Sequence, residues 1–270
     1  MKDHDFGRGE AGASTARRRF LGTMAGVGAG AALAGLSARQ SARATSATLD
    51  AVGCGESVQD ILNAALVAER LATTFYYTGL TTRAITGDHR VAGYAANPNA
   101  VSRNGDPANV AYLQAALDQE NRHARILSDL GATAPYKEFY FPTSTFDQIG
   151  YTSMPDTFLW SIDHLETTFI SAYLAAIDRF GALGRYDLAL LAARFLGVEC
   201  EHRALYRVIA GDDPADNVTL EVASFACIGD AVQALTPFLT GNGFPAGATA
   251  AIPLPEPAHI ARVVGENRSA

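Results

Sequence analysis

Apolar residues recur at steps of three and four along much of the chain after residue 56, the spacing that places them on one face of an α-helix. The first such stretch covers about 57–80. Its apolar positions are Ile61, Leu62, Ala65, Leu66, Ala68, Ala72 and Phe75. Only the run 137–141 alternates in the way that a strand requires. The pattern therefore predicts an all-α fold.

Residues that favour helix starts and helix ends mark three further long helices. They are Asp106, Pro107 and Gly131 for the second helix, Ser153, Pro155, Asp156 and Gly181 for the third, and Gly211 after 185–210 for the fourth. We expect the third helix to begin after Ser153, because Asp156 stands three residues on in a capping-box pattern. A short fifth helix is expected over about 228–239.

The lengths of the links favour a four-helix bundle. About 25 residues join the first two helices and about 22 join the second to the third, whereas the third and fourth are separated by a very short link that predicts an antiparallel hairpin. The expected bundle core is 57–211, with a long crossover between its second and third helices. A C-terminal extension covers 212–270.

Metal-binding residue types recur once on each of the four helices. Two helices carry Glu-x-x-His, whose ends lie on one helix face and can hold the same ion, and the other two carry one glutamate within an apolar stretch. In chain order the residues are Glu69, Glu120 with His123, Glu166, and Glu199 with His202. A bundle with these faces inward collects four carboxylates and two imidazoles, a ligand set typical of dinuclear sites.

Chance placement predicts roughly 0.2 Glu-x-x-His matches in a chain of this composition. The chain has three. The third, Glu256 to His259, lies among prolines where we expect no helix, so we set it aside. Two divalent ions would balance four ionised glutamates that are otherwise costly to bury. A bundle with protonated or surface-turned carboxylates, or a degenerate site without metal, remains the alternative.

Two tyrosines follow the isolated glutamates at a common spacing. Tyr76 stands seven residues after Glu69, and Tyr173 seven after Glu166, so each lies two turns along the same helix face. Either tyrosine could donate a hydrogen bond to a ligand carboxylate, supply an electron, or simply pack at the rim of the bundle. Tyr206 also follows Glu199 by seven.

The order of these ligands, together with the long crossover, resembles the ferritin-like di-iron carboxylate superfamily, and most closely the exported bacterial ferritin-like domain and desiccation-related proteins. The resemblance covers about 57–211. It implies that Glu120 and Glu199 bridge two ions while the other four ligands are mainly terminal. It also implies reaction with O₂ or peroxide at two iron or manganese ions.

The ligand types suit iron or manganese better than copper or zinc, which prefer more nitrogen or sulfur. We expect two iron ions, with two manganese ions as the alternative. The expected substrate is a small oxidant or Fe(II), so we expect redox chemistry such as ferroxidase or catalase-like activity. A second hypothesis is a non-catalytic envelope or desiccation-stress protein in which the metals only stabilise the bundle or the site is vestigial. A catalytic site needs an open coordination position, whereas a structural site is closed.

The first 47 residues read as an export signal. Arg17 and Arg18 are followed by one residue and then by Phe20 and Leu21, an uncharged Gly- and Ala-rich stretch comes next, and 42–44 offers a small-x-small cleavage site. We expect export by the Tat machinery to the periplasm, envelope or outside of the cell, without stable membrane insertion after cleavage. An uncleaved membrane anchor is the alternative.

The net charge of the chain is distributed unevenly between the expected export signal and the remainder. The chain has 270 residues and a net charge of −7, and residues 1–47 hold seven Lys and Arg against three Asp and Glu. The remaining 223 residues therefore carry −11, which argues against nucleic acid as a partner because phosphates require a basic surface.

Three cysteines in an exported protein allow at most one internal disulfide. Cys54 with Cys227 is the favoured pair, and we expect Cys200 to be a packed small apolar residue. His164 is expected at a polar rim rather than at a metal. The stretch 136–141 is expected to pack its crossover against the bundle, or alternatively to form a partner surface.

Overall fold

The computed structural model describes residues 54–82, 107–147, 149–153, 155–212, 223–244 and 249–265. They all belong to one compact unit that spans 51–270. The expected export signal at 1–47 lies outside the described residues, as does Asp106. None of the described helices is long and apolar enough to span a membrane.

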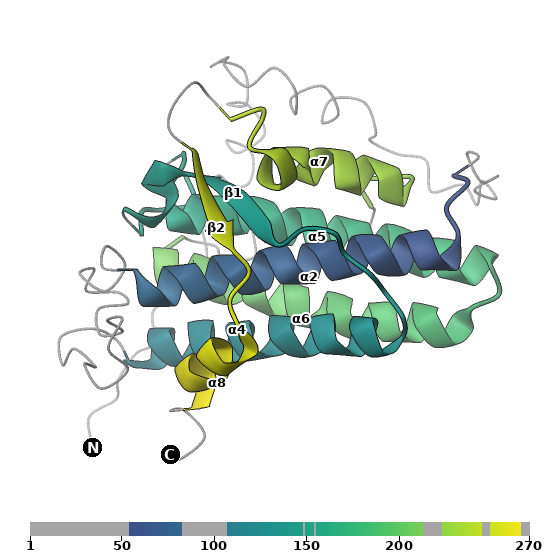
Figure 1. Ribbon diagram of the computed structural model, residues 1–270, viewed down its shortest axis with the longest axis horizontal. Coiled ribbons are helices and arrows are strands. Elements are labelled where there is room, and N and C mark those ends of the chain that lie inside the picture. Colours follow the sequence, from purple (N-terminus) through teal and green to yellow (C-terminus); the bar gives the residue numbers. More distant parts are fainter. Residues whose placement is uncertain are drawn as a thin grey trace, which may run out of the picture. The chain divides into compact units, whose positions relative to one another are not determined.

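Four long helices form the bundle that the sequence predicts: α2 (Val58–Thr81), α4 (Pro107–Asp129), α5 (Phe158–Ala182) and α6 (Tyr186–Ala210). They lie side by side with their axes roughly aligned (Figure 1). α2 packs most extensively on α4, and α5 on α6, which follows it after a short turn. The expected all-α fold and the α5–α6 hairpin are confirmed.

Local sequence explains where α2 begins and where α6 ends. The Ser57 side chain accepts a hydrogen bond from Asp60 N at 3.2 Å, and the Asp60 carboxylate accepts one from Ser57 N at 2.9 Å, which together form a capping box before α2. Gly211 follows the last residue of α6 and ends this helix in the left-handed conformation, with φ of 78°.

The expected start of α5 after Ser153 is wrong. The helix begins at Phe158, and Thr157 is its N-cap, whose side chain accepts a hydrogen bond from Trp160 N. Asp156 has φ of 60°, a left-handed conformation that a right-handed helix cannot include. The Ser153–Asp156 pattern therefore belongs to a turn.

A short two-stranded sheet crosses the bundle. β1 (Glu138–Pro142) lies in the long crossover and pairs antiparallel with β2 (Thr249–Pro253) (Figure 1). β1 matches the expected strand, and Phe139 and Phe141 are fully buried, so the crossover packs against the core. The sequence pattern does not predict β2, because its residues TAAIP are all half-buried or exposed and show no clear alternation.

The C-terminal extension contributes α7 (Ile228–Thr240) and α8 (Pro257–Gly265). α7 corresponds to the expected fifth helix. The expectation of no helix near Glu256 is wrong, because Pro257 occupies the first helical position, where its missing N–H costs no hydrogen bond. Glu256 and His259 are nevertheless exposed, and they belong to no ligand cluster among the described residues.

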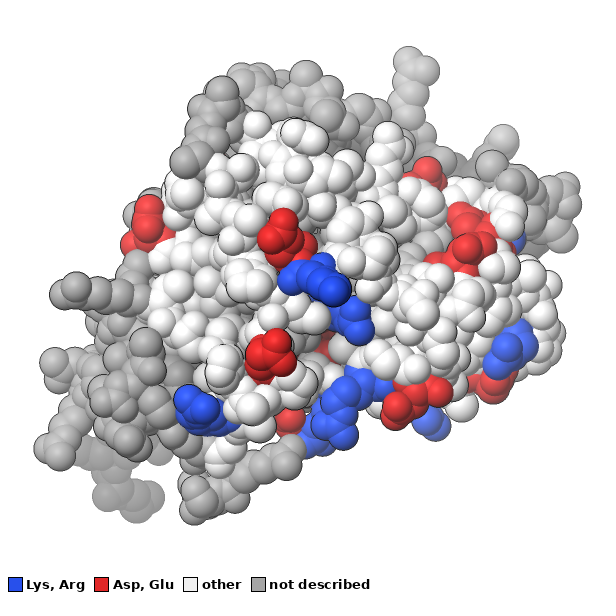
Figure 2. All heavy atoms as spheres, in the orientation of Figure 1, with Lys and Arg blue, Asp and Glu red and all other residues white. Residues whose placement is uncertain are grey.

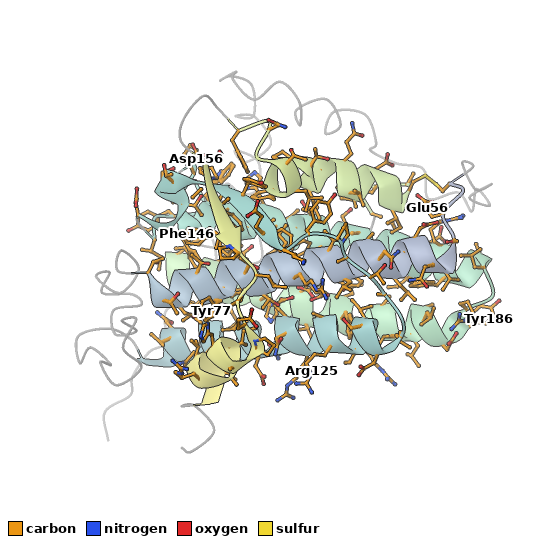
Figure 3. The ribbon with its side chains drawn as sticks, in the orientation of Figure 1. Glu56, Tyr77, Arg125, Phe146, Asp156 and Tyr186 are labelled. Atoms are coloured by element: carbon orange, nitrogen blue, oxygen red, sulfur yellow. A yellow bond between two sulfur atoms is a disulfide. The ribbon has the colours of Figure 1, made fainter. Side chains whose placement is uncertain are left out.

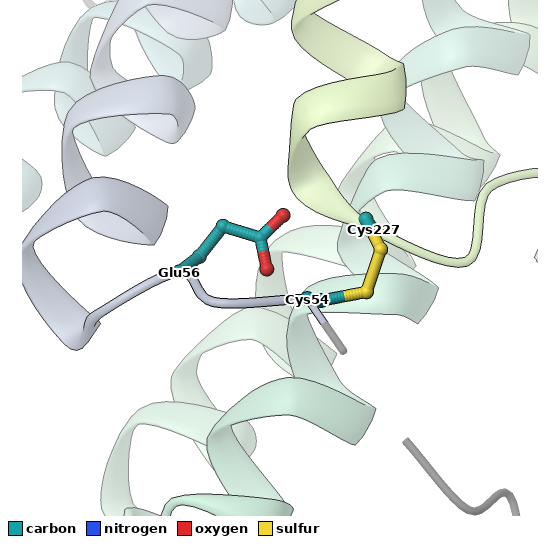
Figure 4. Close-up of side chains that lie close together, drawn as sticks. All are labelled: Cys54, Glu56 and Cys227. Carbon is teal, nitrogen blue, oxygen red and sulfur yellow. A yellow bond between two sulfur atoms is a disulfide. The ribbon is translucent and has the colours of Figure 1, made fainter. Parts of the chain in front are cut away.

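A disulfide ties the segment before α2 to the start of α7. Cys54 and Cys227 are bonded, as expected, with their Cα atoms 5.5 Å apart (Figure 4). Beside them, Glu56 Oε1 accepts a hydrogen bond from Gly229 N at 3.1 Å, and Arg179 of α5 donates to the Cys54 carbonyl at 2.5 Å. The expectation of a packed Cys200 is wrong, because this residue lies on the exposed face of α6.

Candidate metal centre

The bundle interior brings together all six residues singled out by the sequence pattern. α2 supplies one glutamate, α5 supplies another, and α4 and α6 each supply a Glu-x-x-His pair. Each of the six is no more than 6% exposed. They are Glu69, Glu120, His123, Glu166, Glu199 and His202.

These residues form two overlapping ligand groups. One contains Glu69 and His123, the other contains Glu166 and His202, and both contain Glu120 and Glu199. Within each group one ligand atom per residue lies within 4.8 Å of all the others. The two shared glutamates therefore stand where bridging carboxylates between two ions would be.

Several polar atoms at the centre are short of hydrogen bonds, although His202 Nδ1 and Glu120 Oε1 lie 2.8 Å from each other. Among the described residues none makes a well-aligned hydrogen bond to the following buried atoms: Glu120 Oε1, Glu166 Oε2, both carboxylate oxygens of Glu199, and His202 Nδ1. Buried polar atoms without partners are costly and call for an explanation such as an ion. Carboxylate oxygens and imidazole nitrogens are donors that iron and manganese accept, so the residues present fit a pair of divalent ions.

In the first half-site, His123 faces two carboxylates. Its Nδ1 lies 3.2 Å from Glu69 Oε2 and 3.4 Å from Glu199 Oε1. The imidazole stacks on the ring of Phe195, with centroids 3.9 Å apart and planes inclined by 18°. The carboxylates contact Nδ1, and no described residue hydrogen-bonds to the other nitrogen of this ring, so on that side the described support is the stack on Phe195.

In the second half-site, an amide holds the histidine. His202 Nδ1 lies 2.8 Å from Glu120 Oε1 and 3.5 Å from Glu199 Oε2, while its Nε2 lies 2.8 Å from Gln119 Oε1. An Nε2–H donated to this oxygen leaves Nδ1 unprotonated and directed at the carboxylates. The sequence pattern does not single out Gln119. Its only signal is its position next to Glu120, which the second motif does not repeat, since Val198 precedes Glu199.

The two tyrosines cross between the half-sites. Tyr76 of α2 donates to Glu166 Oε1 of α5 at 2.5 Å, and Tyr173 of α5 donates to Glu69 Oε1 of α2. Each hydroxyl thus holds the isolated glutamate of the opposite helix. Tyr206 makes no such bond although it has the same spacing, because its hydroxyl donates to Asp163 at 2.9 Å.

Burial and mutual repulsion set the protonation of the centre in the absence of metal. Burial, reinforced by the charge of Glu199, raises the pKa values of Glu120 and Glu166 well above the ordinary range. Burial opposes the charged form of His123, yet the carboxylates of Glu69 and Glu199 raise its pKa to about 10. Burial would also raise the pKa of Glu199, but contacts with the two histidines hold it below its usual range.

Residues outside the six ligands play other parts. His164 is half-buried, its ring lies against Trp160 with the planes inclined by 32°, and it belongs to neither candidate ligand group among the described residues. On the face of the bundle that Figure 2 shows, acidic and basic side chains are interspersed and separated by uncharged surface.

Fold and site together define a helical-bundle protein with a buried carboxylate–histidine cluster compatible with two metal ions. The family model described as "Ferritin-like domain" matches residues 57–212, more than half of the chain. The chain belongs to this ferritin-like family, as its ligand order suggested. No curated protein and no solved structure matches the chain.

Proposed function

We propose that this protein is exported, binds two iron ions in the buried centre, and carries out redox chemistry with O₂, peroxide or Fe(II). Two manganese ions are the alternative cofactor. The observation that carries the proposal is the pair of ligand groups that share Glu120 and Glu199. A pair of redox-active ions, when bound there, supplies two electrons to a small oxidant.

The chain's own residues prepare the site in three ways. Tyr76 and Tyr173 orient the isolated glutamates through hydrogen bonds. Gln119 holds His202 in the orientation and tautomer that a metal needs. Burial of the six ligands excludes bulk water, which strengthens the attraction between carboxylates and cations.

Elemental analysis of the mature protein, purified after native export without added metal, tests the proposal. We expect about two iron ions per chain, following the two ligand groups, and consumption of O₂ when Fe(II) is added. Manganese in the same amount would direct the activity assay to peroxide disproportionation. Less than one ion of any kind per chain would contradict the proposal. The Glu256→Gln variant is the control, and it must contain as much metal as the wild-type protein.

A purely structural metal site is the second candidate function, and the low exposure of all six ligands favours it. Azide separates the two candidates, because it binds a metal ion only where a coordination position is open. A spectral change on adding azide to the metal-loaded protein supports the redox proposal. An unchanged spectrum together with a large metal-dependent rise in Tm supports the structural role.

Export is proposed from the twin-arginine pattern in the first 47 residues. Replacing Arg17 and Arg18 by lysine should keep the protein in the cytoplasm, because the arginine pair selects the Tat route. Fractionation of cells that express either form measures this. Export of the double lysine variant at the wild-type level would exclude the Tat machinery as the partner.

A further inference from the structure

The outer face of α6 carries large apolar side chains that remain exposed. Leu190 is 55% exposed, Val208 60% and Tyr186 74%, and Tyr186 lies at the beginning of the helix, at one end of the bundle (Figure 3). Leu190 and Tyr186 lie one turn apart, whereas Val208 lies near the far end of the same helix, so a partner that covered all three would have to run along the length of α6.

The middle of this face is built from small residues. Between Leu190 and Val208 this face includes Ala193, Gly197 and Cys200, which are exposed, and Ala204, which is half-buried. From Tyr186 to Ala204 the steps alternate between four and three residues, the spacing of a coiled-coil seam. Small side chains along a seam allow a second helix to approach closely, so this face suits a helix rather than a loop or a sheet.

The charged residues beside the seam would pair with each other between two antiparallel copies of α6. Arg194 and Glu201 are exposed, lie seven residues apart on the same flank of α6, and form no ion pair with any described residue. Two copies of α6 that run antiparallel would place the arginine of each beside the glutamate of the other. Parallel copies would place this flank beside the opposite flank of the partner helix, so Arg194 and Glu201 would not meet.

We propose that two copies of this chain form a dimer through α6, around a two-fold axis that passes between Val198 and Glu199. Leu190 then packs beside Val208 of the second copy, Gly197 beside Cys200, and Arg194 beside Glu201, and symmetry repeats each contact. The surface is separate from the metal ligands, so the dimer does not depend on the proposed function.

Sedimentation velocity of the mature protein at micromolar concentrations tests this arrangement. We expect a dimer for wild type and for Arg262→Glu, which makes the same charge change on α8. Arg194→Glu should weaken the dimer about tenfold or more, because it places glutamates together twice. Adding Glu201→Arg should restore the dimer by exchanging the two charges.

A second variant tests close approach without disturbing the protomer. A Cβ added at Gly197 meets no atom within 4 Å, so Gly197→Leu should fold normally and still separate the dimer. A short bis-maleimide should join two wild-type chains through Cys200, and should not join Gly197→Leu chains. A wild-type monomer, or a dimer unchanged in both Arg194→Glu and Gly197→Leu, would overturn the proposal.

Discussion

The two histidines of the centre differ in what supports the ring on the side away from the carboxylates: the Nε2 atom of His202 hydrogen-bonds to the Gln119 amide, whereas the ring of His123 stacks on Phe195. The difference follows from the positions around the two motifs. Gln119 precedes Glu120, but Val198 precedes Glu199; Phe195 lies four residues before Glu199, but the matching position before Glu120 is Ala116.

This contrast shows that repeated ligands do not make equivalent half-sites. A hydrogen bond from the far side fixes both the rotation and the tautomer of an imidazole, while stacking fixes the ring plane and leaves the proton unassigned. We therefore expect the half-site of His202 to bind metal more tightly than the half-site of His123.

The largest expected effect is the loss of both metal ions when a glutamate shared by the two ligand groups is removed. Glu120→Ala and Glu199→Ala each delete a carboxylate that both ligand groups share, so either variant should retain less than one ion per chain, as measured by elemental analysis. The fold should persist, because the apolar cores on both sides of the centre are unchanged, and circular dichroism checks this. Wild-type metal content in either variant would refute the bridging assignment.

Removing an unshared glutamate should separate the half-sites. Glu69→Ala damages only the group of His123, and Glu166→Ala only that of His202. Each variant should keep about one ion per chain, since three ligands of the other group remain alongside its histidine. The ion left in Glu69→Ala should resist chelator longer than the ion left in Glu166→Ala. Equal loss rates would remove the proposed difference between the halves.

Alkaline pH should destabilise the metal-free protein. The folded-state pKa of His123, about 10, lies above its unfolded value of 6.5, so its contribution is complete below 6.5 and is lost as pH rises through 10. The raised pKa values of Glu120 and Glu166 affect stability with the same sign. Their stabilising contribution is complete below the unfolded-state pKa of 4.5 and is lost as the pH rises through their higher folded-state values. Each proton retained by the folded state is worth about 1.4 kcal/mol per pH unit.

Thermal unfolding of the metal-free protein between pH 6 and 9 measures this effect, with the metal-loaded protein as the comparison. We expect Tm to fall with pH only without metal, because bound ions favour the deprotonated ligands. A metal-free Tm that rises across this range would show that the site is not protonated as described.

The smallest expected effects come from removing the amide beside His202 or adding one at the matching position beside His123. Gln119→Leu should weaken metal binding at the half-site of His202 by about 10- to 100-fold, the usual consequence of losing a hydrogen bond to a ligand histidine. Val198→Gln places an amide at the matching position before Glu199. It should strengthen the half-site of His123, and competition with a chelator measures both changes. No change in Gln119→Leu would mean that orientation is set elsewhere.

Periodicity and helix-ending residues were enough to predict four helices and the order of the ligands, because a bundle buries one face of each helix and metal ligands must lie on that face. The start of α5 was misplaced because a capping pattern is local, whereas the left-handed Asp156 is part of a turn that tertiary packing decides. β2 was missed because its pairing with β1 is a contact between distant segments.

The sequence predicts the cluster of candidate ligands because Glu-x-x-His and the isolated glutamates each occur twice, whereas the residues that support them occur once and follow no pattern. Gln119 and Phe195 have no matching residue in the other half, so no pattern within the sequence distinguishes them from ordinary bundle residues. The tyrosines were found by spacing, but that spacing could not show that each binds the glutamate of the opposite helix.

The disulfide described at the start of α7 has a topological consequence. Cys54 and Cys227 are 173 residues apart, so α2, α4, α5 and α6 all lie within one closed covalent ring. Restricting an unfolded loop of this length stabilises the folded state by about 5 kcal/mol in the chain-entropy model. One peptide-bond cleavage anywhere in the ring opens it without releasing a fragment, so all four ligand-bearing helices stay covalently joined after a single cut.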